Sequence, residues 1–352
     1  MKEKYIPTTF KEKIEYSINL IRNAEKLALK YDEIDGFFLA FSGGKDSQCL
    51  YHLAKMAGVK FKAHMSMTSV DPPEVIKFVR KVYPDVKLHP PKQSIYKYAI
   101  EKQLLPSMRV RWCCAELKEQ AGAGKVTLIG IRKAESSRRA KRNEVEVSNH
   151  KFSGDLDSFE KWQYEKIKKK LKHLNQDQFS ENKEHSIRCI NGKDSIIVSP
   201  ILYWTEKDVW RFLNKNNIHH CSLYDKGYKR IGCILCPMSQ KKQKIREMQD
   251  FPHVKKNWIR AIKKIRGGGG ICKHQYFNRE QMPDTLHIRT QTIGSAEQRD
   301  MGGFSSCSSS DRLTDEQENE IAENIFDWWL SGVSYKKWYA NKFKQLKLKF
   351  DE

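Results

Sequence analysis

The feature that most constrains this sequence is a glycine pair between an apolar run and a helix-like segment. Residues Ser42–Ser47 spell Ser-Gly-Gly-Lys-Asp-Ser, after the apolar run Phe37–Phe41 and before the helix-like Gln48–Ala54. Glycines at a strand-to-helix turn let the backbone approach a ligand closely, and the N–H groups that begin the helix point at an anion. Lys45 adds a positive charge and the two serines add hydroxyl donors. We therefore expect a pyrophosphate site, although the spacing differs from the Gly-x-x-x-x-Gly-Lys-Ser/Thr loop of kinase-like and motor NTPases.

Strand-like segments alternate with helix-like segments through the first part of the chain. Strands are expected at Phe37–Phe41, Val59–Met67, Val86–His89, Val126–Ile131 and Ile196–Ser199. Helices are expected from Thr9 to about Tyr31 and over Glu74–Val82. This alternation favours an α/β fold with a doubly wound, mostly parallel sheet. In such folds the ligand binds at the carboxyl ends of the strands, where Ser42–Ser47 is found.

Shifts in composition predict how the 352 residues are organised. Residues 1–265 are expected to form the nucleotide-binding domain, with a polar insertion at 141–194 that contains one amphipathic helix. Four consecutive glycines followed by a Ser/Gly-rich stretch predict a flexible linker or loop at 266–313. Residues 314–352 are expected to be helical and basic, because Thr314 and Gln317 can form a capping box ahead of a lysine-rich tail.

The charge of the chain favours a polyanionic partner. The formal net charge is +22, which suits DNA or RNA, although a lysine-rich solvated surface is the alternative. No apolar run approaches the roughly 20 residues that a membrane span needs, and the first residues lack the apolar core of a signal peptide. We therefore expect a cytoplasmic protein without a membrane partner.

Four of the nine cysteines have the spacing of metal ligands. Cys113 and Cys114 are adjacent, and Cys233 and Cys236 form a Cys-x-x-Cys turn. In a reducing compartment such residues are thiols or metal ligands rather than disulfides. Adjacent cysteines fit one zinc ion poorly, whereas in a [4Fe–4S] cluster each thiolate binds a different iron. We expect the cluster, with zinc as the alternative and small buried thiols without metal as the third possibility.

Together these motifs resemble the phosphoadenosine-phosphosulfate (PAPS) reductase family of the PP-loop (N-type ATP pyrophosphatase) superfamily. The loop and the cysteines are joined by Pro73-Glu74 and by two longer segments, Gly130–Arg139 and Pro200–Trp210, that resemble segments of the family. The resemblance covers about Phe37 to Met238. It implies an adenine nucleotide alpha-hydrolase-like fold, with an adenine nucleotide along the carboxyl edge of the sheet.

The resemblance and the chemistry of the residues together define the expected site. The expected catalytic residues are Lys45, Asp46 and Arg132. The ammonium group of Lys45 and the guanidinium group of Arg132 suit phosphate or sulfate oxygens. The residues expected to bind the nucleotide are Ser42, Gly43, Gly44, Lys45, Asp46, Ser47, Glu74, Gly130, Arg132 and Arg139. The residues expected to bind the metal are Cys113, Cys114, Cys233 and Cys236. The nucleotide is ATP, PAPS or adenylylsulfate, and Mg²⁺ would neutralise a leaving pyrophosphate.

Three functions are compatible with the sequence. Sulfonucleotide reductases of this family carry a nucleophilic cysteine in a Glu-Cys-Gly-x-His motif, which these 352 residues do not contain. We therefore favour ATP cleavage and adenylylation of a substrate oxygen, followed by cluster-assisted delivery of sulfur from a donor protein. This reaction resembles those of the enzymes of DNA phosphorothioation and tRNA thiolation. The alternatives are reduction of PAPS or adenylylsulfate through an electron-donor protein or Cys307, and a non-catalytic nucleic-acid-binding or regulatory protein.

Overall fold

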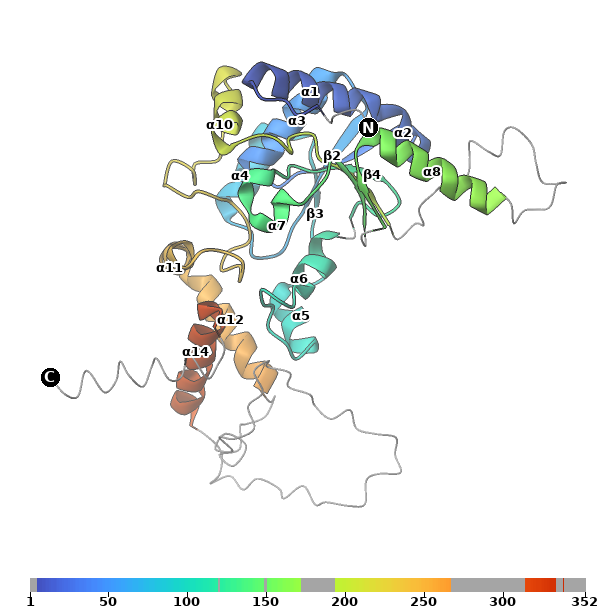
Figure 1. Cartoon of the computed structure of the whole chain (residues 1–352). Helices are drawn as coiled ribbons and strands as arrows, with labels where there is room; N and C mark the ends of the chain where they lie inside the picture. Colours follow the sequence, from blue (N-terminus) through green and yellow to red (C-terminus); the bar gives the residue numbers. More distant parts are fainter. Residues whose placement is uncertain are drawn as a thin grey trace, which may run out of the picture. The chain divides into compact units, whose positions relative to one another are not determined.

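The computed structural model describes residues 5–119, 121–148, 151–171, 194–266, 314–333 and 338, which form two compact units (Figure 1). Unit 1 contains Met1–Met67, Asp71–Pro91 and Ala115–Gly232. Unit 2 contains Thr68–Val70, Lys92–Cys114 and Cys233–Glu352. The expected linker at 266–313 lies outside the described residues except for its first residue, as does most of the tail beyond residue 333. The division of the chain at residue 265 therefore stays a prediction.

Within the described residues, unit 1 contains a seven-stranded sheet in the order β3-β2-β1-β4-β7-β5-β6. The strands are β1 (Phe37–Ala40), β2 (Phe61–Ser66), β3 (Lys87–His89), β4 (Val126–Leu128), β5 (Val145–Val147), β6 (Phe152–Gly154) and β7 (Ile196–Val198). The pairs among β1, β2, β3, β4 and β7 are parallel, whereas β5 pairs antiparallel with both β6 and β7. The predicted α/β fold with a mostly parallel sheet is confirmed.

The central strands are apolar along their length. Phe37, Leu39, Val126 and Leu128 are fully buried, and β1 pairs in register with β2 from Phe37 opposite Phe61. Strands buried on both faces have near-continuous apolar runs, so these segments are recognisable from sequence. The hairpin of β5 and β6 was not predicted. It lies in the expected insertion, and three-residue strands are too short for a periodic pattern.

Helices flank the sheet of unit 1. They are α1 (Phe10–Asn23), α2 (Glu25–Tyr31), α3 (Lys45–Ala57), α4 (Pro73–Val82), α7 (Ser137–Ala140), α8 (Leu156–Leu171) and α10 (Glu206–Lys215), with a π-helical turn at Ala115–Glu119 and a 3₁₀ turn at Lys133–Glu135. Helix α3 packs against both α1 and α10, and the three lie together in Figure 1. The single helix expected from Thr9 to about Tyr31 is two helices that meet at Ala24. The Ala24 N–H still bonds to the Leu20 carbonyl at 3.1 Å, so few hydrogen bonds are lost there.

The described part of unit 2 is helical. It contains α5 (Ile95–Glu101), α6 (Trp112–Cys114), α11 (Lys241–Asp250), α12 (Pro252–Arg266) and α14 (Asp315–Ser331). Trp258 on α12 is 2% exposed and contacts the rings of Tyr96 and Trp329, with centroids 4.9 and 4.8 Å away. The predicted C-terminal helix is confirmed: Thr314 forms the capping box, and Gly332 ends the helix at φ +69°.

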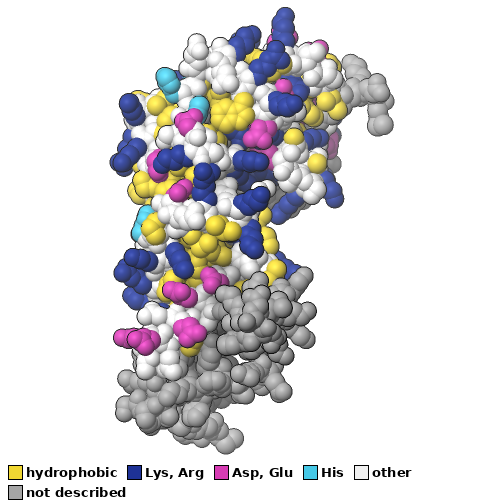
Figure 2. Space-filling model, turned by 90° about the vertical axis from the view of Figure 1, so that its left-hand side faces the viewer, with side chains coloured by type: hydrophobic (Ala, Val, Ile, Leu, Met, Phe, Trp, Pro, Cys, Tyr) yellow, Lys and Arg dark blue, Asp and Glu magenta, His cyan; other side chains and the backbone are white. Residues whose placement is uncertain are grey.

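The described surface carries many separate charges. Figure 2 shows Lys and Arg side chains spread over one face, with Asp and Glu side chains among them. On this face the Lys and Arg side chains are therefore not gathered in one patch. None of the described helices has the length and apolar character that a bilayer crossing requires.

Candidate functional site

The loop Ser42–Ser47 lies where the strand order of the sheet reverses. Strand β1 lies between β2 and β4, with β3 beyond β2 and β7 beyond β4. The loop follows β1, and the segment with Gly130 and Arg132 follows β4. In open α/β sheets this reversal is where two loops leave in opposite directions and a ligand can enter. The topology thus brings two segments that are far apart in the sequence to one site.

Gly43 fits the loop both by its backbone angle and by its missing side chain. Its φ is +71°, a left-handed conformation that glycine adopts without strain. A Cβ atom at this position would lie 2.8 Å from Val75 Cγ1 and 3.0 Å from Val79 Cγ2 on α4. The loop is closed by Ser47, whose hydroxyl donates to the Gly44 carbonyl at 2.8 Å. Because Val75 and Val79 pack so close to Gly43, helix α4 limits where the backbone of the loop can run.

Two buried cations share one carboxylate at the start of α3. Lys45 is 4% exposed and Arg132 is 5% exposed. The Asp46 carboxylate lies 2.6 Å from Arg132 Nε and 3.8 Å from Lys45 Nζ. Lys45 Nζ also lies 3.4 Å from a Glu206 carboxylate oxygen and donates to the Lys229 carbonyl at 3.1 Å. The two cations are thus offset by carboxylates in this structure, and they lie at a helix N-terminus, which itself favours anions.

Two further predicted residues lie beside this cluster. A Cβ atom on Gly130 would lie 3.1 Å from the Asp46 backbone carbonyl, so glycine suits this close approach. Arg139 pairs with Glu135, which also lies 3.5 Å from Arg132. Burial, followed by the nearby charge of Arg230, lowers the pKa of Arg139 to about 10, which leaves it charged at neutral pH.

Glu74 has a different partner from those of the loop. It lies in the first turn of α4, and its Oε1 is 3.4 Å from Lys226 Nζ. Its other carboxylate oxygen is buried without a hydrogen bond. An unpartnered buried oxygen has an energetic cost that a ligand or ion could remove. The nucleotide-binding role of Glu74 stays a prediction.

A pocket of about 170 Å³ opens at the carboxyl ends of β1 and β2; we call it the strand-end pocket. Ser42 and His64 both line it. His64 stacks on Phe38 with ring centroids 4.2 Å apart, and its Nδ1 lies 2.8 Å from His89 Nε2. Burial lowers the pKa of His64 to about 4, so the ring is neutral, and its Nε2 is buried without a partner. Sequence reasoning missed His64, because nothing marks one histidine in an apolar strand.

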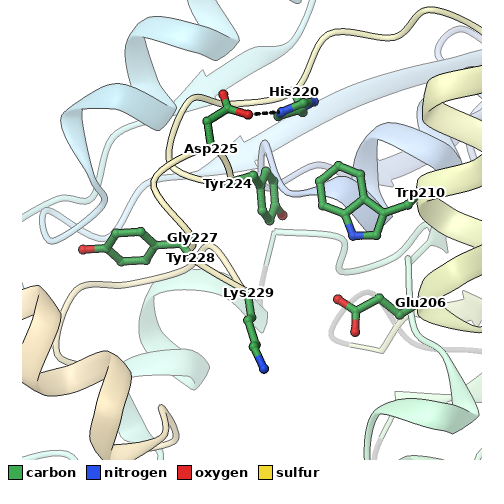
Figure 3. A pocket seen from close by; sticks show the side chains of 8 residues that line it. All are labelled: Glu206, Trp210, His220, Tyr224, Asp225, Gly227, Tyr228 and Lys229. Atoms are coloured by element: carbon green, nitrogen blue, oxygen red, sulfur yellow. Dashed lines mark hydrogen bonds and ion pairs between the residues drawn. The ribbon is translucent and has the colours of Figure 1, made fainter.

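A second hollow of about 400 Å³ lies next to Lys45, which contacts Tyr224 in its lining; we call it the aromatic pocket. Trp210 projects from α10 towards Tyr224 on the following loop (Figure 3). The Tyr224 hydroxyl accepts a hydrogen bond from the Lys45 N–H at 2.9 Å. His220 lies beside them and pairs with Asp225 at 2.8 Å. These residues were also missed, although Trp210 belongs to a segment that the family resemblance covers.

All four predicted metal ligands belong to unit 2. Cys113 and Cys114 lie on α6, and Cys233 and Cys236 begin and end one turn. The pKa of the Cys113 thiol is raised, first by a hydrogen bond with Cys114, then by burial and by the thiols of Cys233 and Cys236. The Cys113 sulfur is therefore close enough to those of Cys114, Cys233 and Cys236 to interact with them electrostatically.

A guanidinium lies among the surroundings of these thiols. The described residues contain no group of three His, Cys, Asp or Glu side chains placed to hold a single metal ion. In a [4Fe–4S] cluster four thiolates surround one cluster and each binds a different iron. Arg111 lies 3.2 Å from the Cys114 sulfur and can offset thiolate charge. The donor set thus fits the expected cluster.

Comparison with known proteins identifies the family. Residues 36–239 match the phosphoadenosine phosphosulfate reductase domain family. The chain belongs to this family. An uncharacterized protein of Methanocaldococcus jannaschii is 27% identical over 235 residues, which is 64% of this chain and 47% of that protein. The chain thus spans about half the length of this curated relative.

Other similarities are more local or more distant. The adenosine 5'-phosphosulfate reductase of Lysinibacillus sphaericus is 52% identical over 42 residues, 12% of this chain and 18% of that enzyme. Among solved structures, a U34-tRNA thiolase of Methanococcus maripaludis with its [4Fe-4S] cluster has a TM-score of 0.34 at 13% identity, covering 72% of this chain and 78% of that one. A similarity this distant carries no argument about function.

Proposed function

We propose that the chain binds ATP on Ser42–Ser47, cleaves it between the α- and β-phosphates, and transfers the adenylyl group to an acceptor oxygen that sulfur then replaces. The observation that carries the proposal is the pair of buried cations, Lys45 and Arg132, on either side of Asp46. The leaving pyrophosphate is strongly negative. Fixed, buried cations stabilise such developing charge far more than they would in bulk water.

Each residue of the cluster has a separate task in this proposal. The N-terminus of α3 and the backbone at Gly43 and Gly44 face the phosphates. Lys45 exchanges its contacts with Glu206 and the Lys229 carbonyl for phosphate oxygens, and Arg132 holds them in a planar fork. Asp46 is the carboxylate that would hold Mg²⁺ together with the phosphates.

The acceptor in this proposal is a nucleic acid. A net charge of +22 supports a polyanionic substrate, and phosphate contacts by Lys and Arg would hold it. Cys113, Cys114, Cys233 and Cys236 would hold a [4Fe–4S] cluster, which would supply sulfur-transfer chemistry. Arg111 compensates part of the thiolate charge in unit 2.

The ATP step is tested by measuring release of pyrophosphate and AMP, with Mg²⁺ and with or without nucleic acid. Lys45→Met keeps the length of the buried side chain but removes its charge. We expect it to lower kcat by about 10²- to 10³-fold, the loss typical of one charge-stabilising group. Lys55→Met is the matched control, because Lys55 lies on the same helix but is exposed and contacts Tyr51.

Three results would contradict the ATP proposal. Equal rates of pyrophosphate release in Lys45→Met and Lys55→Met would show that the loop lysine does not take part in the reaction. Sulfite release from PAPS or adenylylsulfate without ATP cleavage would establish the reductase instead. Nucleic-acid binding with neither reaction would favour the non-catalytic alternative.

The cluster is tested on protein purified without oxygen. We expect iron and acid-labile sulfide together with broad visible absorbance, all lost in Cys233→Ala. Cys221→Ala is the control, since Cys221 is a buried thiol of unit 1 outside the expected ligand set. A colourless wild-type protein with bound zinc and no iron would contradict the cluster.

A further inference from the structure

The aromatic pocket is built from three half-buried rings that do not stack on one another. Trp210 and Tyr224 lie with centroids 5.0 Å apart at 88°, and Trp210 and His220 lie 5.4 Å apart at 86°. His220 and Tyr224 are 6.1 Å apart at 70°. None of the three pairs is stacked face to face, and all three rings line the pocket, where a planar ligand can contact them.

Polar groups surround these rings. Glu206 and Lys229 are exposed at the border of the pocket, and the His220–Asp225 pair forms another part of it (Figure 3). These groups supply both donors and acceptors in the plane of a bound ring. Unstacked nucleobases are recognised in this way, by stacking on aromatic side chains and hydrogen bonds along the base edge. An aliphatic ligand would use neither feature.

The pocket is directly connected to the phosphate loop through one residue. Lys45 contacts three residues that line the pocket, namely Tyr224 through its N–H and both Glu206 and Lys229 through its Nζ. Its ammonium group also lies 5.6 Å from the centre of the Tyr224 ring. A ligand in the pocket would therefore lie next to the group that holds the phosphates.

The adenine of ATP has a different place available. The strand-end pocket is lined by Ser42 and by residues at the carboxyl ends of β1 and β2, the region where nucleotides bind in open α/β folds. Ser42 lines the strand-end pocket, whereas Lys45 contacts the lining of the aromatic pocket. Two pockets beside one phosphate loop suit a reaction with two substrates.

We infer that the aromatic pocket binds a single unstacked base of the acceptor nucleic acid and presents its oxygen to the α-phosphate of ATP beside Lys45. This rests on the proposed function for the identity of the acceptor. In the reaction, a carbonyl oxygen of the base attacks the α-phosphorus of ATP, and the proton of the neighbouring ring N–H is released to water. The bond from that phosphorus to the bridging oxygen breaks, and pyrophosphate leaves with the electron pair. Trp210 stacks on the base. Tyr224 connects the pocket to the phosphate loop, because its hydroxyl accepts the hydrogen bond from the Lys45 N–H.

The test measures binding of labelled single-stranded oligo(dT) and oligo(U), without ATP, and of an abasic oligomer of the same length. Wild-type protein is expected to prefer the oligomers with bases. Trp210→Ala should weaken that binding by about 5- to 100-fold, as removal of one stacking side chain does. The dependence on salt should stay the same, because no phosphate contact is removed. Trp210→Phe, which keeps a ring, should retain most of the affinity.

Two controls separate this effect from misfolding and from loss of the ATP site. Trp162→Ala removes another half-exposed tryptophan of unit 1, one that contacts Phe152 and Phe159, and should leave binding within about twofold. Circular dichroism and affinity for ATP should be unchanged in Trp210→Ala.

Several outcomes would overturn the inference. These are equal binding of abasic and base-containing oligomers, no binding of either, or wild-type affinity in Trp210→Ala. A parallel loss of ATP affinity would show instead that the pocket holds the adenine of ATP. Failure of the proposed function is a separate result, because pyrophosphate release is measured with ATP and oligonucleotide binding without it.

Discussion

Replacing Gly43 by alanine is the sharpest test of how α4 shapes the phosphate loop. The added Cβ would lie 2.8 Å from Val75 Cγ1 and 3.0 Å from Val79 Cγ2, and Val75 and Val79 are each 1% exposed. At φ +71° an alanine is also strained, whatever space surrounds it. The substitution therefore combines a backbone cost with a steric one.

The two costs can be estimated separately. A left-handed conformation costs alanine about 1 to 2 kcal/mol relative to glycine. Forcing one methyl group into a packed region costs about 1 to 3 kcal/mol. We therefore expect Gly43→Ala to lower the free energy of unfolding by about 2 to 5 kcal/mol, and to weaken ATP binding because the loop must move.

Gly58→Ala provides the matched control. Gly58 ends the same helix that Gly44 begins and has φ +72°, and a Cβ atom added there would have no other atom within 4 Å. Only the backbone cost of about 1 to 2 kcal/mol should remain there, with ATP affinity unchanged. Urea unfolding followed by circular dichroism gives both free energies, and calorimetric titration gives the affinities.

A double-mutant cycle isolates the contact itself. Val75→Ala should remove the closest clash, so that Gly43→Ala costs less in its presence than in the wild type. We expect a coupling energy of about 1 to 2 kcal/mol, within the range for residues in contact. Equal costs for Gly43→Ala and Gly58→Ala, or strict additivity with Val75→Ala, would refute the role assigned to α4.

Two further predictions concern buried charge. Arg132→Met leaves Asp46 without its closest partner and should lower the free energy of unfolding by about 3 to 5 kcal/mol. Lys97→Met breaks an exposed ion pair and should lower the same free energy by only about 0 to 1 kcal/mol. Equal losses for the two variants in urea unfolding would contradict this. Burial lowers the pKa of His64 to about 4, so between pH 6.5 and pH 4 the unfolded chain binds more protons than the native one. Stability should therefore fall as the pH falls through this range, by at most about 1.4 kcal/mol per pH unit, and the fall should be shallower in His64→Gln.

The fold was predictable where the apolar pattern was long enough to be specific. The strand expected at Phe37–Phe41 is found at Phe37–Ala40, and that at Val59–Met67 is found at Phe61–Ser66. Strand ends were less certain, because hydrogen bonding rather than side-chain type decides where pairing stops. The hairpin at residues 145–154 was missed because each of its strands has three residues.

The candidate site was predictable only where neighbours in sequence carry the chemistry. Lys45 and Asp46 follow from the loop itself, and the structure brings Arg132 to them. His64 and Trp210 could not be found in this way, because their surroundings are created by strand pairing and by the loop that follows α10. Their roles, like those of the cysteines, stay predictions for experiment.

The short outer strands of the sheet have a consequence for how the molecules behave in concentrated solution. In the part of the chain that the structure describes, the sheet ends at β3 on one side and β6 on the other, each three residues long. The open edge of a sheet can pair with the backbone of another chain, and a long flat edge promotes aggregation. Exposed Lys87 on β3 further discourages such pairing. Each edge therefore offers few free backbone groups for pairing with the sheet of a neighbouring molecule.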